Sequence, residues 1–185
     1  PRFHPAMRHA GPTRRELGIP TAFNVLGPLA NPAGVSRLMI GLADGGMAQR
    51  MIGVLAARGC DRVLIVHGDD GLDELTTTTT STVWELDGDV VRTWRLDPGP
   101  LGLAPAAPSD LVGGDPAANA GFARAVLAGE RGPHRDIVVL NAAAALLIGG
   151  AVSNLEEGVG LAGTVLDDGR AAAALDALAA ASHAP

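Results

Sequence analysis

Lysine and tyrosine are absent from this sequence, aromatic residues make up 3% of it, and cysteine occurs once. All 14 basic residues are therefore arginines, a bias that suggests a GC-rich genome and says nothing about function. Because aromatic side chains are so few, the core has to be built from leucine, valine, isoleucine and alanine. The single Cys60 excludes an intrachain disulfide framework and a cysteine-based zinc site, and we expect it to be a buried structural thiol.

Long apolar runs and a signal peptide are also lacking. No apolar stretch reaches the length of about 18 residues that a membrane-spanning helix requires. We therefore expect a soluble, cytoplasmic protein with no membrane partner. The formal net charge of -6 argues against a nucleic-acid-binding protein, whose contact surface is basic.

The length of 185 residues, 47% of them hydrophobic, predicts one globular domain over residues 1–185. The sequence opens at Pro1 rather than at a methionine and enters motif-rich sequence at once. We therefore expect this single domain to be incomplete and to belong to a longer protein.

The segment from Val63 to Leu75 (VLIVHGDDGLDEL) joins a predicted strand to an acidic loop. Its four consecutive apolar residues predict a strand that is buried on both faces. In open α/β sheets, ligands bind beyond the carboxyl ends of the strands, and Mg²⁺ takes one or two protein carboxylates plus substrate phosphates. The loop is either such a metal–phosphate site or a solvated acidic loop, and the residues alone favour the solvated loop. Its four carboxylates are those of Asp69, Asp70, Asp73 and Glu74.

The residues before this segment predict a parallel pair of strands. Residues 37–43 are typical of a short buried strand, and residues 46–58 of an amphipathic helix that ends at Gly59. Together with the strand at 63–66 they form a βαβ unit. Closer to the N-terminus, Thr13–Leu17 predicts a short helix that stops at Gly18, and residues 23–32 predict an irregular apolar loop.

The second half predicts a β-hairpin followed by helices. Residues 76–86 and 90–96 are expected to be strands joined by a turn at Asp87-Gly88. The β propensity of threonine explains the run at 76–80 adequately, although its hydroxyls could also donate hydrogen bonds. Four helices are then expected: from Pro116 to about Ala128 with Asp115 as N-cap, from Asp136 to Ile148, from a cap at Ser153 to about Gly163, and from Asp167-Asp168-Gly169 to about Ala181.

These patterns do not by themselves identify a reaction. The sequence contains no Gly-x-Gly-x-x-Gly opening a helix, no Walker loop, no nucleophile elbow and no His-Glu-x-x-His motif. A single His4 in a loop and a single Arg14 on a short helix are more often structural or solvated than functional. The residues therefore predict an α/β domain in which the acidic loop is a candidate divalent-metal and anion site.

Several segments are similar, in order and over essentially the whole chain, to one known family. The first are HPAMRH at 4–9, RRELGI at 14–19 and FNVLGPLANPA at 23–33, and the segment HG at 67–68 with GLDELT at 71–76 resembles the metal loop of the same family. Later pieces agree: GGD at 113–115, NA at 119–120, NAA at 141–143 and LDDGRA at 166–171. The family is that of the anthranilate phosphoribosyltransferases.

This resemblance implies an α/β fold with a partly parallel sheet flanked by helices and a β-hairpin insertion, as in the C-terminal domains of nucleoside phosphorylases and phosphoribosyltransferases. It implies Mg²⁺-assisted transfer of phosphoribose from phosphoribosyl pyrophosphate (PRPP) to the amino group of anthranilate, in tryptophan biosynthesis. No residue of the chain is expected to act as a strong base, because an aromatic amine is neutral at pH 7 and needs positioning instead.

The resemblance also assigns roles by position. Arg14 would clamp the carboxylate of anthranilate, and His4 and Pro28 would line the route of that substrate. Asp73 and Glu74 would hold Mg²⁺ against the pyrophosphate, which leaves Asp69 and Asp70 as charges at the rim of the site.

The family's glycine-rich phosphate loop, its Lys-His-Gly-Asn motif and its N-terminal helical domain would all precede Pro1. We therefore expect the 185 residues alone to be inactive, and the full-length protein to be a homodimer. Two other interpretations stay open. One is a relative on the same fold, such as a pyrimidine nucleoside phosphorylase or a paralogue with another aromatic substrate. The other is a non-catalytic remnant that serves as a binding module.

Overall fold

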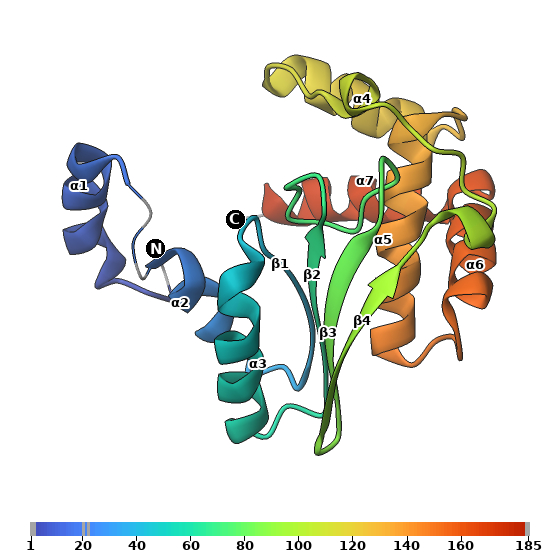
Figure 1. The fold of residues 1–185 in the computed structure, drawn as a ribbon. Helices are drawn as coiled ribbons and strands as arrows, with labels where there is room; N and C mark the ends of the chain where they lie inside the picture. Colours follow the sequence, from blue (N-terminus) through green and yellow to red (C-terminus); the bar gives the residue numbers. More distant parts are fainter. Residues whose placement is uncertain (1–2, 20, 22, 184–185) are drawn as a thin grey trace.

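A computed structural model of the chain describes residues 3–19, 21 and 23–183. A four-stranded sheet with the order β1-β2-β3-β4 lies at its centre (Figure 1). The strands are β1 (Arg37–Gly41), β2 (Arg62–Gly68), β3 (Ser81–Asp87) and β4 (Val90–Leu96). β1 and β2 are parallel, whereas β2–β3 and β3–β4 are antiparallel. The predicted partly parallel sheet with a β-hairpin is therefore confirmed.

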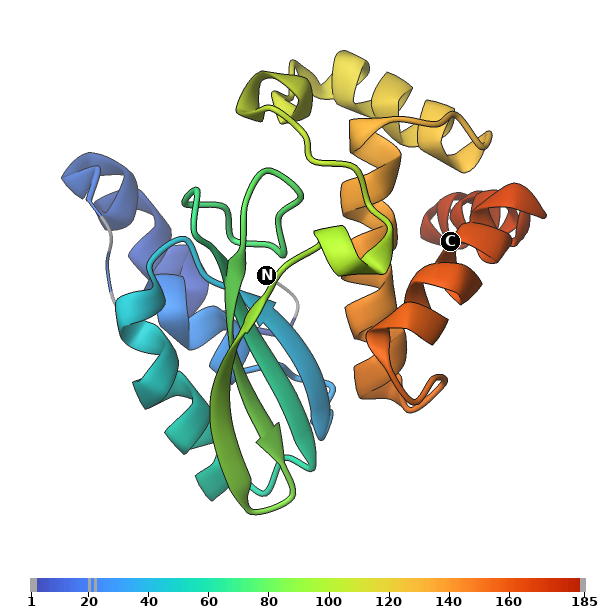
Figure 2. The same cartoon turned by 45° about the vertical axis from the view of Figure 1, so that its right-hand side comes forward.

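Helices cover both faces of this sheet (Figure 2). Helix α3 packs on one face, and α5 packs on the other with α4, α6 and α7 around it. α1 and α2 lie to the side of α3, away from the sheet (Figure 1). The helices are α1 (Met7–Leu17), α2 (Phe23–Leu29), α3 (Ala48–Ala57), α4 (Pro116–Leu127), α5 (Pro133–Gly149), α6 (Leu155–Asp167) and α7 (Arg170–Ser182), with short 3₁₀ turns η1 (Gly45–Met47), η2 (Gly99–Leu101) and η3 (Pro108–Leu111).

The side chains of β2 alternate between two hydrophobic cores. Val63 and Ile65 belong to the core with Met51, Ile52 and Leu55 of α3. The intervening Leu64 and Val66 belong to the core on the side of α5, which includes the fully buried Leu140 and Ala144. All four strand residues are at most 2% exposed, which confirms the prediction of a strand covered on both faces. Within residues 3–19, 21 and 23–183, no helix combines the length and the apolar character of a membrane-spanning segment.

The N-terminal region is more helical than predicted. α1 is longer than the expected Thr13–Leu17 and contains Pro12, although Gly18 ends it as expected, with φ +61°. The predicted irregular loop at 23–32 is wrong over Phe23–Leu29, which is helix α2 and contains Pro28. Proline disfavours a helix interior, but Val25 and Leu29 pack against the core beneath α3. Tertiary packing therefore outweighs the local signal.

Three smaller expectations also need correction. β3 begins at Ser81, so the threonine run at 76–80 is not part of a strand. The N-cap of α6 is Asn154 rather than Ser153, since its side chain accepts a hydrogen bond of 2.8 Å from the backbone N–H of Glu157. Cys60, predicted to be buried, is half-buried against the α3 core. The predicted cap at Asp115 is confirmed, because its carboxylate accepts from the N–H of Ala118 at 2.8 Å.

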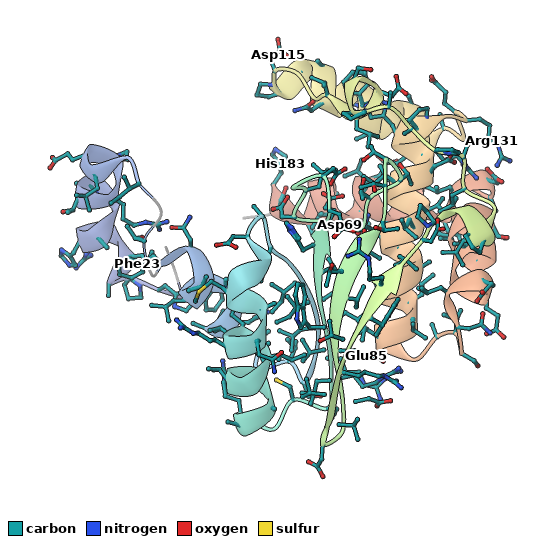
Figure 3. The ribbon with its side chains drawn as sticks, in the orientation of Figure 1. Phe23, Asp69, Glu85, Asp115, Arg131 and His183 are labelled. Carbon is teal, nitrogen blue, oxygen red and sulfur yellow. The ribbon has the colours of Figure 1, made fainter. Side chains whose placement is uncertain are left out.

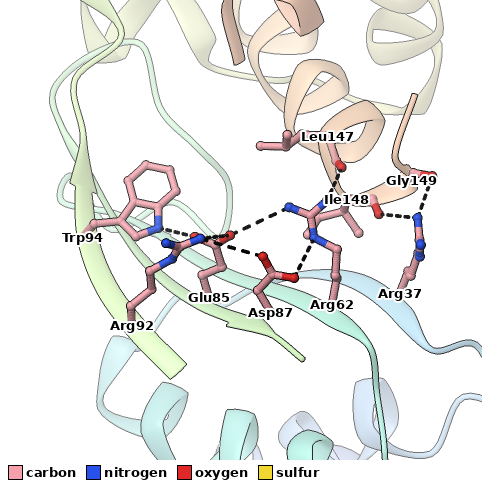
Figure 4. Close-up of polar contacts among 9 residues, drawn as sticks. All are labelled: Arg37, Arg62, Glu85, Asp87, Arg92, Trp94, Leu147, Ile148 and Gly149. Carbon is pink, nitrogen blue, oxygen red and sulfur yellow. Dashed lines mark hydrogen bonds and ion pairs between the residues drawn. The ribbon is translucent and has the colours of Figure 1, made fainter. Parts of the chain in front are cut away.

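Two arginines at the start of the parallel strands hold the C-terminal end of α5 (Figure 4). Arg37 Nη1 donates to the carbonyl of Gly149 at 2.9 Å, and Arg62 Nη1 donates to the carbonyl of Leu147 at 3.1 Å. The last carbonyls of a helix have no intrahelical partner and carry a partial negative charge. The two arginines supply hydrogen-bond donors and positive charge to these carbonyls, and they therefore fix the end of α5 against the sheet.

Beside these arginines lies Glu85, a carboxylate that is 6% exposed (Figure 4). It accepts hydrogen bonds from Arg92 Nε at 3.0 Å and from the indole N–H of Trp94 at 2.8 Å. Arg62 Nη2 lies 4.0 Å from its other oxygen. A buried charge is tolerated when it is paired and hydrogen-bonded in this way.

We expect Glu85→Ala to destabilise the chain by about 2 kcal/mol, because Arg92 and the Trp94 N–H lose the carboxylate that they bind and Arg62 loses a neighbouring negative charge. The free energy of unfolding in urea measures this effect. Glu85→Gln is the matched control, since it keeps the shape and an acceptor while removing the charge, and it should be destabilised by less. A urea midpoint of unfolding for Glu85→Ala equal to that of the wild type would contradict the stabilising role of the Glu85 contacts.

Candidate active site

A cavity of about 540 Å³ lies where the parallel strands β1 and β2 end. Such an edge is the usual ligand site of an open α/β sheet. The loop after β1 and the loop after β2 meet here, and an imidazole–carbonyl hydrogen bond of 2.8 Å joins His67 Nδ1 to Leu42. The cavity is lined by Thr21, Asn24, Val25, Gly41, Leu42, Ala43, Asp44, Met47 and Asp73.

Asp73 and Glu74 occupy the loop after β2, and both are exposed. In the part of the chain that the structure describes, neither carboxylate has a hydrogen-bond or ion-pair partner. Asp73 borders the 540 Å³ cavity, whereas Glu74 borders a second cavity of about 320 Å³ against α4 and α5. Partial burial beside this second, largely apolar cavity raises the pKa of Glu74, and the charge of Asp73 raises it further. The pair is thus an uncompensated double charge between two cavities.

These two carboxylates suit a hard divalent cation. Residues 3–19, 21 and 23–183 contain no group of three or more histidine, cysteine, aspartate or glutamate side chains placed to hold a metal. A site that depended on protein ligands alone is therefore not formed by these residues. Mg²⁺, however, typically takes one or two carboxylates and completes its shell with water and substrate phosphates. The donor set of Asp73 and Glu74 fits that requirement.

Asp69 and Asp70 are exposed, as expected for rim charges, but they also organise the loop. Asp70 accepts hydrogen bonds from the hydroxyls of Thr76, at 2.7 Å, and Thr78. Its other oxygen accepts from the N–H of Leu72 at 3.1 Å. Burial tends to raise the pKa of Asp70, but these hydrogen bonds outweigh it and lower the pKa overall.

Asp69 binds threonines at and just beyond the C-terminal end of the run at 76–80. Its carboxylate accepts from the hydroxyl groups of Thr80 and Thr82 and pairs with Arg95. Asp69 is labelled in Figure 3. Within the run at 76–80, the hydroxyls of Thr76, Thr78 and Thr80 therefore act as donors to the two aspartates. β propensity does not account for the run, which is outside β3. The acidic loop is held by its own side chains.

Two residues that support the loop were not singled out as site residues from the sequence. An ideal Cβ added to Gly41 would stand 1.6 Å from the backbone oxygen of Asp73. Only glycine at position 41 therefore leaves room for the backbone of the loop. Asn141 of α5 accepts from the N–H of Leu75 at 3.0 Å and donates to its carbonyl at 2.8 Å. A glycine at the end of a buried strand was an available signal for the first. For the second, the available signal was the segment NAA at 141–143 in the family resemblance, which assigned it no role.

The arginine predicted to bind substrate lies next to the first cavity. Arg14 Nη2 donates to Asn24 Oδ1 at 3.3 Å, and Asn24 lines the cavity. The guanidinium carbon of Arg14 also lies 5.5 Å from the centre of the Phe23 ring, a cation–π distance. Figure 3 shows Phe23 between α1 and α2, where α2 begins. Arg14 is thus held by α2, through the ring of Phe23 and through Asn24, which lines the cavity.

The structure does not bring the other two predicted substrate residues into this cavity. His4 is exposed, and its contact with the described residues is through its backbone carbonyl, which accepts from the N–H of Met7 at 3.1 Å. Pro28 is half-buried inside α2. Neither residue lines the 540 Å³ cavity. Their roles in binding stay predictions.

Comparison with known families agrees with this architecture. Residues 1–172 match the glycosyl transferase family, a/b domain, and the chain therefore belongs to that family. Within it, the chain is similar to anthranilate phosphoribosyltransferases, as the sequence segments indicated. It is 54% identical over 181 residues to the enzyme of Methylobacterium nodulans, and the match covers 98% of this chain and 54% of the relative.

Solved structures with the same fold carry the same name. Anthranilate phosphoribosyltransferase from Thermus thermophilus superposes with a TM-score of 0.85 at 41% identity, covering 94% of this chain and 51% of that one. The enzyme from Saccharomyces cerevisiae in complex with PRPP and Mg gives a TM-score of 0.82 at 31% identity, covering 92% and 49%. Its complex with 4-fluoroanthranilate gives 0.83 at 30% identity, covering 92% and 50%. The chain spans about half the length of the curated relatives it matches.

Proposed function

We propose that this chain forms part of the catalytic α/β domain of an enzyme that transfers phosphoribose from PRPP to the amino group of anthranilate. The observation that carries this proposal is the placement of two carboxylates without ion-pair partners among the described residues, those of Asp73 and Glu74, just beyond the ends of the parallel strands. Asp73 borders the cavity that Asn24 also lines, and Arg14 binds Asn24. The Saccharomyces cerevisiae relative, solved with PRPP and Mg and with 4-fluoroanthranilate, supports the same substrates and the same metal for this chain.

In this proposal Asp73 and Glu74 bind Mg²⁺ together with the pyrophosphate group of PRPP. Bound there, Mg²⁺ supplies positive charge that stabilises the negative charge growing on the departing pyrophosphate. The two carboxylates are suited to this task because no arginine or backbone N–H of the described residues neutralises them. Partial burial, and after it the negative charge of Asp73, raises the pKa of Glu74.

The opposite side of the cavity would bind anthranilate. The planar guanidinium of Arg14 can form two parallel hydrogen bonds to the substrate carboxylate. Asn24 and the ring of Phe23 hold that guanidinium in place. The aromatic amine is neutral at pH 7, so the reaction needs the amine aligned with C1 of the ribose more than it needs a strong base. His4 and Pro28 are proposed to line the approach of anthranilate.

The remaining parts of this proposal concern the whole gene product. We propose that it acts in the cytoplasm in tryptophan biosynthesis and forms a homodimer. The role in tryptophan biosynthesis and the homodimer are proposed from the resemblance to anthranilate phosphoribosyltransferases, the name that the relatives carry.

The test is growth of a tryptophan auxotroph that lacks this enzyme and carries the complete gene encoding this chain. The unmutated gene should restore growth without tryptophan, and Arg14→Ala should not, because the substrate carboxylate loses its bidentate partner. Purified Arg14→Ala protein should show a KM for anthranilate raised by about 10- to 100-fold, the loss expected for a charge-assisted hydrogen bond of about 1.5–3 kcal/mol.

Arg15→Ala is the matched control. Arg15 is the neighbouring exposed arginine of α1, and its side chain has no hydrogen-bond or ion-pair partner among the described residues. This variant should rescue growth as the unmutated gene does. Failure of the unmutated gene to rescue would overturn anthranilate as the substrate and favour a paralogue that acts on another aromatic compound.

A further inference from the structure

The loop that carries Asp73 and Glu74 is fixed on both sides of the pair. On the N-terminal side of Asp73, the N–H of Leu72 donates to the carboxylate of Asp70 at 3.1 Å, and the carbonyl of Leu72 accepts from the N–H of Gly68 at 2.9 Å. After Glu74, both backbone groups of Leu75 are bound to Asn141. The two carboxylates between these anchors have no partner among the described residues. A tethered backbone with free side chains is the arrangement expected of a pre-organised ligand site.

The Asn141 side chain is held in one orientation. Its Oδ1 accepts from the N–H of Leu75 at 3.0 Å, and its Nδ2 donates to the carbonyls of Leu75 at 2.8 Å and Ile137 at 3.0 Å. An amide flipped by 180° would set donor against donor and acceptor against acceptor at all three contacts. The hydrogen-bond pattern therefore assigns the amide and makes it a two-point clamp on Leu75.

The clamp connects the loop to a rigid part of the fold. Asn141 follows the fully buried Leu140 on α5, and Ala143 and Ala144 on the next turn are also fully buried. Leu75 is 1% exposed, so water cannot replace the lost bonds of its backbone if Asn141 is removed. The segment that follows Glu74 thus takes its position from α5.

We infer that Asn141 is a positioning residue that aims Asp73 and Glu74 at Mg²⁺ and pyrophosphate by holding the backbone of Leu75. This inference rests on the metal role proposed above for the two carboxylates. Asn141 touches neither the substrate nor the reacting atoms; it acts through the loop. Residues that orient metal ligands typically change metal affinity by about 10- to 100-fold when they are removed.

Calorimetric titration of the full gene product with Mg²⁺ in the presence of pyrophosphate tests this inference. Asn141→Ala should weaken binding by about 10- to 100-fold. Asn141→Leu should weaken it to a similar extent, because it restores the side-chain volume but not the hydrogen bonds. Without Mg²⁺, both variants should show faster amide hydrogen exchange in residues 72–76, whereas the exchange of β2 should stay unchanged.

Asn119→Ala is the matched control. Asn119 makes the same kind of two-point clamp on Gly114, accepting from its N–H at 2.8 Å and donating to its carbonyl at 3.0 Å. That clamp lies at the start of α4 and holds no carboxylate pair, so its loss should leave Mg²⁺ binding at the wild-type value.

The outcomes separate the inference from the proposed function. Wild-type affinity in Asn141→Leu, with the double variant Asp73→Ala/Glu74→Ala unable to bind, would overturn the positioning role and leave the metal site intact. A wild-type protein that binds no Mg²⁺ with pyrophosphate would overturn the metal site, and the positioning role with it. Weak binding in both Asn141 variants but not in Asn119→Ala supports the inference.

Discussion

Replacing Asp73 and Glu74 together with alanine is expected to abolish the binding of Mg²⁺ with pyrophosphate and to make the metal-free protein more stable at pH 7. Binding is lost because the two substitutions remove both free carboxylates of the loop. Stability rises because the ionised form of Glu74 is disfavoured in the folded chain, by partial burial and by the charge of Asp73. Such a trade-off, in which residues needed for function lower the stability of the folded protein, is common at functional sites.

The sign of the stability effect follows from the direction of the shift. The pKa of Glu74 is raised in the folded chain, so the folded state holds its proton more tightly than the unfolded chain does. The ionised carboxylate therefore opposes folding above this raised pKa, and the opposition disappears as the pH falls through it. The gain in stability of the double variant should accordingly be present at pH 7 and shrink under acidic conditions.

Calorimetry measures the binding, and urea unfolding at several pH values measures the stability. The matched control is Asp89→Ala/Asp176→Ala, which removes two negative charges from exposed positions in the β3–β4 turn and in α7. It should bind Mg²⁺ with pyrophosphate as the wild type does. Retention of tight binding by the Asp73→Ala/Glu74→Ala protein would refute the assignment of these residues as metal ligands.

Gly41→Ala is expected to disrupt the same loop from the other side. The new Cβ would stand 1.6 Å from the backbone oxygen of Asp73 and 2.6 Å from its carbonyl carbon. Backbone atoms cannot rotate away as a flexible side chain would, so either the end of β1 or the loop has to move. We expect a loss of about 3 kcal/mol in the free energy of unfolding, and a loss of Mg²⁺ and pyrophosphate binding that accompanies the displaced Asp73.

Gly53→Ala provides the comparison. Gly53 lies in the interior of α3, and a Cβ added there meets no atom within 4 Å. This substitution should stabilise the chain by about 0.5–1 kcal/mol, because alanine favours a helix more than glycine does. If Gly41→Ala were as stable as Gly53→Ala and bound metal normally, the close approach of Gly41 to Asp73 would not be a constraint on the site.

Much of the fold could be predicted from local patterns. The run from Val63 to Val66 indicated a strand buried on both faces, and its side chains do alternate between two cores. The βαβ unit, the turn at Asp87-Gly88 and the cap at Asp115 were likewise predicted from residues close together in the chain. Helix α2 was missed, because the punctuation by Pro28 and Gly27 is local while the contact of Val25 and Leu29 with the α3 core is not.

The sequence by itself determined the α/β class, through the short-range patterns of its residues. It also carried the family resemblance, and that resemblance singled out the pair Asp73–Glu74 among four carboxylates as the candidate metal ligands. Only the tertiary structure decided how that pair is supported. Gly41 meets Asp73 from the neighbouring strand, and Asn141 reaches Leu75 across 66 positions of sequence. Such contacts arise from the packing of α5 and β1 around the end of β2. No local pattern of residues encodes them, because they exist only when distant segments are brought together.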